Sequence, residues 1–170
     1  KPNGSTIMSL WLMTGFSFLG KNIFNIWPII FGVYLFSRYQ KEPFLNYTLV
    51  ALLGTSLSPI VSQISFNNNE YTLFSITLGI LVGIVVGFVL PPIASYSIKA
   101  HNGYNLYNSG FASGLLATLL MSIMRGFGIN LDSRLIWHSG SNNILFILLI
   151  ICCIYLIAIG IIYGKNNKDT

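Results

Sequence analysis

Long uncharged stretches, separated by small groups of charged residues, dominate the chain. Four of these stretches are long enough to contain a membrane-spanning helix of about 20 residues; they run over residues 43–69, 71–98, 102–124 and 135–164. We therefore expect membrane segments over residues 43–66, 71–98, 104–124 and 143–163. The last segment is the purest apolar stretch: residues 144–163 contain no charged side chain and no polar side chain except two tyrosines.

The first 40 residues follow a different pattern. Two apolar segments, residues 6–19 and 26–36, are each shorter than the ~17 residues of the shortest spanning helices. The stretch GKNIFNIWP joins them, which predicts a short helical hairpin over residues 1–40. The hairpin either enters the membrane and turns back, or consists of two short or tilted spanning helices. Pro28 suits the first turn of the returning helix, and Asn25 is close enough to cap it.

Composition indicates an integral membrane protein. Charged residues make up 8% of the 170 residues and hydrophobic residues 54%, whereas a soluble domain has roughly 25% charged residues. In lipid, the backbone groups must pair within helices. We therefore expect an all-α polytopic fold with broken or re-entrant helices, forming a single transmembrane domain over residues 1–170 with the bilayer as its main partner.

The net charge of +5 does not indicate a nucleic-acid partner, because the basic residues are scattered at the ends of the apolar segments. Alternating the segments across the membrane places most basic residues on one side. The positive-inside rule makes that side the cytoplasm. The residues predicted to face it are Lys1, Arg38, Lys41, Lys99, Lys165 and Lys168.

Residues typical of soluble enzymes are nearly absent. The four carboxylates, Glu42, Glu70, Asp132 and Asp169, are isolated near segment ends. His101 and His138 lack flanking ligands at metal spacing. The serines of WHSGSNN lack the strand–turn–helix context of a nucleophile elbow, and Cys152 and Cys153 are best explained as apolar residues of the last segment. The sequence predicts no enzyme activity, no metal and no cofactor.

Polar side chains, all uncharged except Lys21, occur where the apolar segments are interrupted. KNIFN supplies Lys21, Asn22 and Asn25 at the tip of the hairpin; GTSLSPIVSQ places Thr55, Ser58, Ser62 and Gln63 around Pro59. Pro91 and Pro92 predict a further break. Broken helices with polar linings are tolerated at membrane depth only where they face protein or a water-filled cavity, and transporters use them to bind solutes.

The stretch HNGYNLYNSGFASG, residues 101–114, is polar without being charged after its histidine. Its candidate binding residues are Asn102, Tyr104, Asn105, Tyr107 and Asn108. In a helix the three asparagines would share one face, and their amides could replace the water shell of a neutral solute. The alternative is an aromatic belt at the membrane interface.

These motifs predict a transporter or channel for a small polar solute that is neutral or weakly anionic. Lys21, Asn22 and Asn25 would line one side of the path and the residue 102–108 motif the other, and a transporter predicts that the two sets meet near the membrane midplane. No carboxylate lies within these intervals to relay protons, which favours a channel or facilitator. The alternative is a membrane scaffold, or a subunit of a membrane complex, that transports nothing.

Small residues recur at every fourth position in two places. Ser75, Gly79, Gly83 and Gly87 form one stripe, and Gly110 and Gly114 repeat the spacing. Such stripes let helix backbones approach closely, so they predict helix packing and not a binding site.

Several long motifs carry a resemblance to a known family. They begin with NGSTIMSLWLMTGFSFLGKNIFNIWPIIFGVYLFSRYQKEP and continue with GTSLSPIVSQ, GFVLPPIASYSIKAHNGYNLYNSGFASGLLAT and RGFGINLDSRLIW. The chain resembles domain of unknown function 1576, an uncharacterised bacterial family of multi-pass membrane proteins. The resemblance implies a plasma-membrane location and longer relatives with a second copy of the hairpin element.

The chain would then be a fragment, one half of a pseudo-symmetric protein, with the remainder of the full-length chain as a partner. A homo-oligomer is also compatible with the sequence. Tyr107 to Gly114, YNSGFASG, is similar to the glycine–aromatic–asparagine loop of urea transporters. The order of the residues differs, because Asn108 precedes Phe111.

Overall fold

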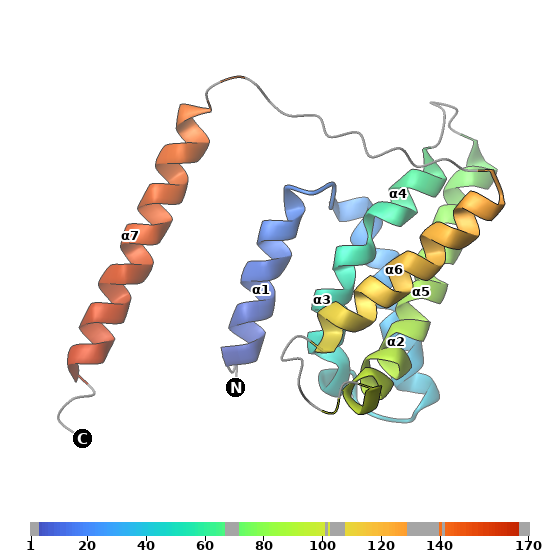
Figure 1. Ribbon diagram of the computed structural model, residues 1–170, viewed down its shortest axis with the longest axis horizontal. Helices are drawn as coiled ribbons and strands as arrows, with labels where there is room; N and C mark the ends of the chain where they lie inside the picture. The colour runs from blue at the N-terminus through green and yellow to red at the C-terminus, as the bar shows by residue number, and fades with distance from the viewer. Residues whose placement is uncertain are drawn as a thin grey trace. The chain divides into compact units, whose positions relative to one another are not determined.

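The computed structural model describes residues 4–66, 72–100, 102, 108–128, 140 and 142–166. Every regular element within these ranges is helical, which confirms the predicted all-α class. In chain order (Figure 1) the elements are α1 (Gly4–Ser17), α2 (Ile23–Tyr39), the 3-10 turn η1 (Phe44–Tyr47), α3 (Thr48–Gly54), the 3-10 turn η2 (Thr55–Leu57), α4 (Pro59–Ser65), α5 (Leu73–Ala100), α6 (Asn108–Gly126) and α7 (Asn143–Asn166). Helices α1 to α6 belong to one compact unit, Lys1–Leu131, and α7 belongs to a second, Asp132–Thr170.

The predicted hairpin is present as α1 and α2, joined by a turn over residues 18–22. The prediction that Asn25 caps the returning helix is wrong. Asn22 is the N-cap, and Asn25 stands three residues later as the second member of a capping box, with each side chain accepting from the other residue's backbone N–H. The box begins the helix earlier than expected, so Pro28 lies inside α2 instead of in its first turn.

The second apolar segment is broken where Pro59 predicts it. Residues 44–57 and α4 bend by 45° relative to each other. Pro59 is the first residue of α4, a position that needs no backbone donor. By contrast, the predicted break at Pro91 and Pro92 is wrong, because α5 continues through both prolines. Each proline removes one helical hydrogen bond, but its fixed φ is close to the helical value.

The small-residue stripe of α5 packs as predicted. A Cβ atom at Gly87 would lie 2.1 Å from the carbonyl oxygen of Ile29, and one at Gly32 would lie 2.2 Å from the carbonyl oxygen of Ile84. The backbones of α2 and α5 therefore touch where these glycines meet. Gly79 allows the same close approach to the backbone of α4, and Gly83 leaves room for the side chains of Pro28 and Val61. Within the described residues, no atom lies within 4 Å of the Cβ position of Gly114 on α6, so the predicted close packing is not observed there.

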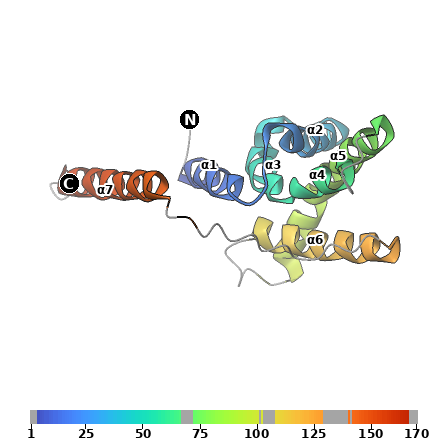
Figure 2. The same cartoon turned by 90° about the horizontal axis from the view of Figure 1, so that it is seen from above.

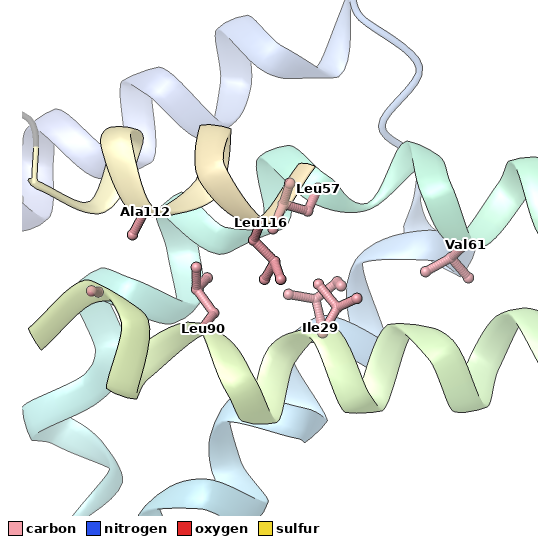
Figure 3. Close-up of a cluster of buried hydrophobic side chains, with 8 residues drawn as sticks. Ile29, Leu57, Val61, Leu90, Ala112 and Leu116 are labelled. Atoms are coloured by element: carbon pink, nitrogen blue, oxygen red, sulfur yellow. The ribbon is translucent and has the colours of Figure 1, made fainter. Parts of the chain in front are cut away.

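A hydrophobic core lies between α2, α4, α5 and α6. Ile29, Leu57, Val61, Leu90, Ala112 and Leu116 are buried in it (Figure 3). Helix α5 packs most extensively against α2 and also against α4 and α6, and the turned view shows it reaching from the α2–α4 group to α6 (Figure 2). This central helix fixes the positions of the polar segments on both of its sides.

Two of the described helices are long and apolar enough to cross a membrane: α5 over Leu73–Ser97 and α7 over Asn143–Tyr163. The bent pair from Phe44 to Ser65 would add a third if it is one span. Nearly every described side chain of α7 is exposed, as expected for a helix whose natural surroundings are apolar.

Candidate functional site

The tip of the hairpin lies against the break at Pro59. Gly20 adopts a φ of +88°, and its Cβ position would be 4.0 Å from the ring of Pro59. This left-handed conformation suits glycine and reverses the chain sharply between α1 and α2. Because the turn and the break meet, the polar residues that the sequence supplies at each interruption come together.

Lys21 points from the turn into this contact. Its Nζ donates to Oγ1 of Thr55 at 2.7 Å and to the carbonyl oxygen of Met13 at 3.3 Å. The ammonium also lies 5.5 Å from the centre of the Phe16 ring, within cation–π range. Within the described residues all of these partners are uncharged, so the half-buried lysine introduces a positive charge that they do not neutralise.

Asn25 is the fully buried member of the group, with 0% of its surface exposed. Its Nδ2 donates to the carbonyl oxygen of Gly20 and to Oγ of Ser62, both at 2.9 Å. Its Oδ1 accepts from the backbone N–H of Asn22. Asn22 itself is exposed and its Nδ2 lies 3.5 Å from the same Ser62 oxygen. Lys21, Asn22 and Asn25 are therefore brought together, with Thr55 and Ser62 completing the cluster.

The cluster lies beside the interior of α5, away from its ends. Pro28 of α2 contacts the Gly83 position and Ile29 contacts the Gly87 position, so the two helices run in the same direction. Asn25 precedes Pro28 by three residues, which is about 4.5 Å along a helix. It therefore lies near the level of residues 79–80 of α5. The second amide-rich motif occupies another part of the unit.

Asn108 is the first residue of α6, and its side chain joins α6 to the end of α5. Its Nδ2 donates to the carbonyl oxygen of Ala94, and its Oδ1 accepts from the hydroxyl of Ser97. Asn102 is exposed in a turn with a φ of 49°. This left-handed conformation does not continue a helix, so the shared helical face predicted for the three asparagines is wrong for Asn102. Tyr104, Asn105 and Tyr107 lie outside the described residues.

The two polar motifs do not meet at Asn108. Figure 1 shows the turn between α1 and α2 at one end of the helices and the first turn of α6 at the other. Ala94 and Ser97 of α5 bond to the side chain of Asn108, whereas the hairpin tip bonds to the turn and the broken segment. The expected meeting at the midplane is therefore not observed for this residue.

Three participants were missed or left unassigned from the sequence. Thr55 and Ser62 stand out as polar positions in an apolar segment, but nothing in the sequence indicates that they bond to the hairpin. Ser97 gives no such signal. Beside the same break, the fully buried Oγ of Ser58 has no hydrogen-bond partner in the described part of the chain, which leaves a donor and an acceptor available there.

Together, these groups suit an anion or a neutral polar molecule. An ammonium, amide N–H groups and hydroxyls supply donors, and the cluster contains no carboxylate to hold a cation. In the described ranges, His, Cys, Asp and Glu side chains form no group of three that could hold a metal; His101 and His138 lie outside these ranges.

Comparison with known proteins identifies the family. No curated protein and no solved structure matches the chain. The sequence profile of the family described as "Protein of unknown function (DUF1576)" matches residues 1–126, which include α1 to α6 and every residue of the cluster at the hairpin tip. The chain therefore belongs to the DUF1576 family of proteins of unknown function.

Proposed function

We propose that the chain is part of a multi-pass plasma-membrane protein that passes a small polar solute, neutral or weakly anionic, through the bilayer. The observation that carries this proposal is the ammonium of Lys21, which uncharged partners hold beside the interior of α5. Ionisable side chains within a membrane are costly, and they mark solute paths more often than they serve packing.

The level of Asn25 along α5 gives its depth in the proposed membrane. The apolar span of α5 runs over Leu73–Ser97, so its middle is near Val85. The level of Asn25, near residue 79 or 80, is then about 8 Å from the middle. The hydrocarbon half-thickness is about 15 Å. With α5 crossing the membrane, Asn25 lies inside the apolar layer, whereas Asn22, three residues earlier at the start of α2, is about 4.5 Å further from the middle and close to the surface of that layer.

The chemistry of the tip favours anions and amides as solutes. The N-terminus of α2 adds a partial positive charge to that of Lys21, and the exposed Asn22 offers both a donor and an acceptor. Asn102, Tyr104, Asn105, Tyr107 and Asn108 would serve a later part of the same path; of these, Asn108 lies at the opposite end of the helices. In a longer protein, a second copy of the hairpin would complete the path as a pseudo-symmetric half.

The test uses the full-length protein in liposomes and measures the entry of acetate and acetamide. We expect Lys21→Gln to lower acetate flux at least tenfold and acetamide flux less, because glutamine keeps hydrogen bonding but removes the charge. Lys41→Gln is the matched control, since Lys41 is an exposed lysine outside the cluster and should leave both fluxes unchanged.

The competing function is a membrane scaffold, which the position of Asn108 at the other end of the helices favours. A scaffold predicts that neither solute enters faster than in protein-free liposomes. If the wild-type protein passes neither solute, nor any other small carboxylate or amide of a broad panel, the proposal is overturned. Equal loss of flux in the Lys21 and Lys41 variants would overturn the role given to Lys21.

A further inference from the structure

A groove of about 340 Å³ lies between the end of α5 and the start of α6, away from the hairpin tip. Pro92, Ile93, Tyr96 and Ala100 of α5 line it together with Phe111 and Leu115 of α6. The polar groups of the lining are the hydroxyls of Tyr96 and Ser97, and the Ser97 hydroxyl is already bonded to Asn108. The groove therefore offers apolar surface and almost no hydrogen bonds.

The side chains that line the groove are apolar and partly exposed. Tyr96 is 69% exposed, Leu115 56% and Phe111 42%. Exposing this much aromatic and aliphatic surface to water is unfavourable, whereas contact with the hydrocarbon of a lipid tail is favourable. A polar solute would find few hydrogen-bond partners in the groove, so the groove is not a suitable continuation of the proposed solute path at the hairpin.

The mouth of the groove carries a positive charge. Nζ of Lys99 lies 5.3 Å from the centre of the Tyr96 ring, so the ammonium sits over a lining residue. Lys99 comes two residues after the end of the apolar span at Ser97, about 3 Å further along the helix. With α5 in the membrane, the groove lies within the outer part of the hydrocarbon and Lys99 lies at the level of the lipid headgroups.

We propose that this groove binds one anionic phospholipid, with an acyl chain against Ile93, Phe111 and Leu115 and the phosphate beside Lys99. Basic residues at the ends of membrane helices attract anionic headgroups. From Lys99 the apolar groove extends toward the membrane interior, as an acyl chain would. A second copy of the chain fits less well, because a symmetric contact at this groove would bring two Lys99 ammonium groups together. The inference rests on the proposed membrane embedding of α5 and does not depend on solute passage.

Native mass spectrometry of the full-length protein, with phosphatidylglycerol and phosphatidylcholine added in equal amounts, tests the proposal. We expect one phosphatidylglycerol to stay bound to the wild type. Leu115→Trp should fill the groove and remove this lipid. The matched control is Leu119→Trp, because Leu119 is exposed one turn further along α6 and does not line the groove; it should retain the lipid.

A second pair of variants tests the headgroup. Lys99→Gln should reduce the preference for phosphatidylglycerol over phosphatidylcholine about fivefold, whereas Lys41→Gln, at an exposed lysine outside the groove, should not. Circular dichroism of each variant checks that the helices are retained. Equal lipid binding by Leu115→Trp and Leu119→Trp would overturn the proposal. A wild-type protein that binds a second copy of the chain in place of the lipid, and loses that copy in Leu115→Trp, would overturn it as well. If the protein binds phosphatidylglycerol but passes no solute, the proposed function fails and the lipid site remains supported.

Discussion

At the scale of single residues, the side chain of Asn25 is tightly held. It is completely buried and connects the turn, the capping box of α2 and the broken segment through one amide group. A buried amide is costly unless its donors and acceptor are satisfied. Here all three groups have partners, so Asn25 determines how the hairpin docks against α4.

Replacing Asn25 by alanine should therefore lower the free energy of unfolding by about 1–3 kcal/mol, because Ser62 and the backbone N–H of Asn22 lose a buried partner. Thermal unfolding of the detergent-solubilised protein, followed by circular dichroism, measures the effect. Asn46→Ala is the control, since Asn46 is exposed with a single 3.4 Å bond to Glu42, and it should change the stability little. A similar loss in both variants would contradict the role of Asn25.

The sequence identified most of this cluster but not its geometry. Lys21, Asn22 and Asn25 stand out because they interrupt apolar sequence, and the structure places them together. Their partner Thr55 is 34 residues away from Lys21, a separation that no local pattern reveals. The choice of Asn25 as the cap was wrong because Asn22 and Asn25 are both good capping residues, and only the backbone shows which one begins the helix.

At the scale of the helices, close packing of α5 against α2 and α4 depends on glycine. Spacing of small residues at every fourth position predicted contact for both α5 and α6, and the structure confirms it for α5 alone. Periodicity defines a helix face, but whether that face is covered depends on the positions of other helices. The same limitation explains the error at Pro91 and Pro92, since the surrounding helices can stabilise a continuous α5 through both.

A pair of glycine-to-alanine variants should show opposite effects. Gly87→Ala places a methyl group against the Ile29 carbonyl oxygen and should destabilise the protein by about 1–3 kcal/mol through overpacking. Gly114→Ala meets nothing within 4 Å and should stabilise it by about 0.5–1 kcal/mol, because alanine favours helix. Thermal unfolding of both variants in the same detergent measures the difference. Two changes of the same sign would contradict the close contact at Gly87.

At the scale of the whole molecule, the directions of the helices place three basic residues at one end. Helix α2 ends near Arg38 and Lys41, and α5, which runs in the same direction, ends near Lys99. Arg125, in the last turn of α6, lies at the opposite end (Figure 1). The alternation inferred from charge alone thus agrees with the order of these helices, although the sequence could not show how the helices pack.

Single-cysteine labelling of intact cells, with Cys152 and Cys153 first replaced by serine, tests the orientation. Cysteines at positions 41 and 99 should stay unlabelled by a membrane-impermeant reagent until the cells are opened, because the basic residues predict that these ends of α2 and α5 face the cytoplasm. A cysteine at position 125 should be labelled from outside. Strong labelling of position 41 or 99 in intact cells would refute the orientation.

The unequal attachment of the two hairpin helices has a consequence for motion. Helix α2 touches α5 backbone to backbone, whereas α1 packs mainly against α3 and η2 and buries only Ser9. Segments with few buried contacts open at lower free energy than the rest of a fold. Amide hydrogen exchange in detergent should therefore be faster along α1 than along α2, and Thr55→Val should accelerate it further at the end of α1 that Lys21 holds. The hairpin would then open by movement of its first helix while its second helix stays fixed.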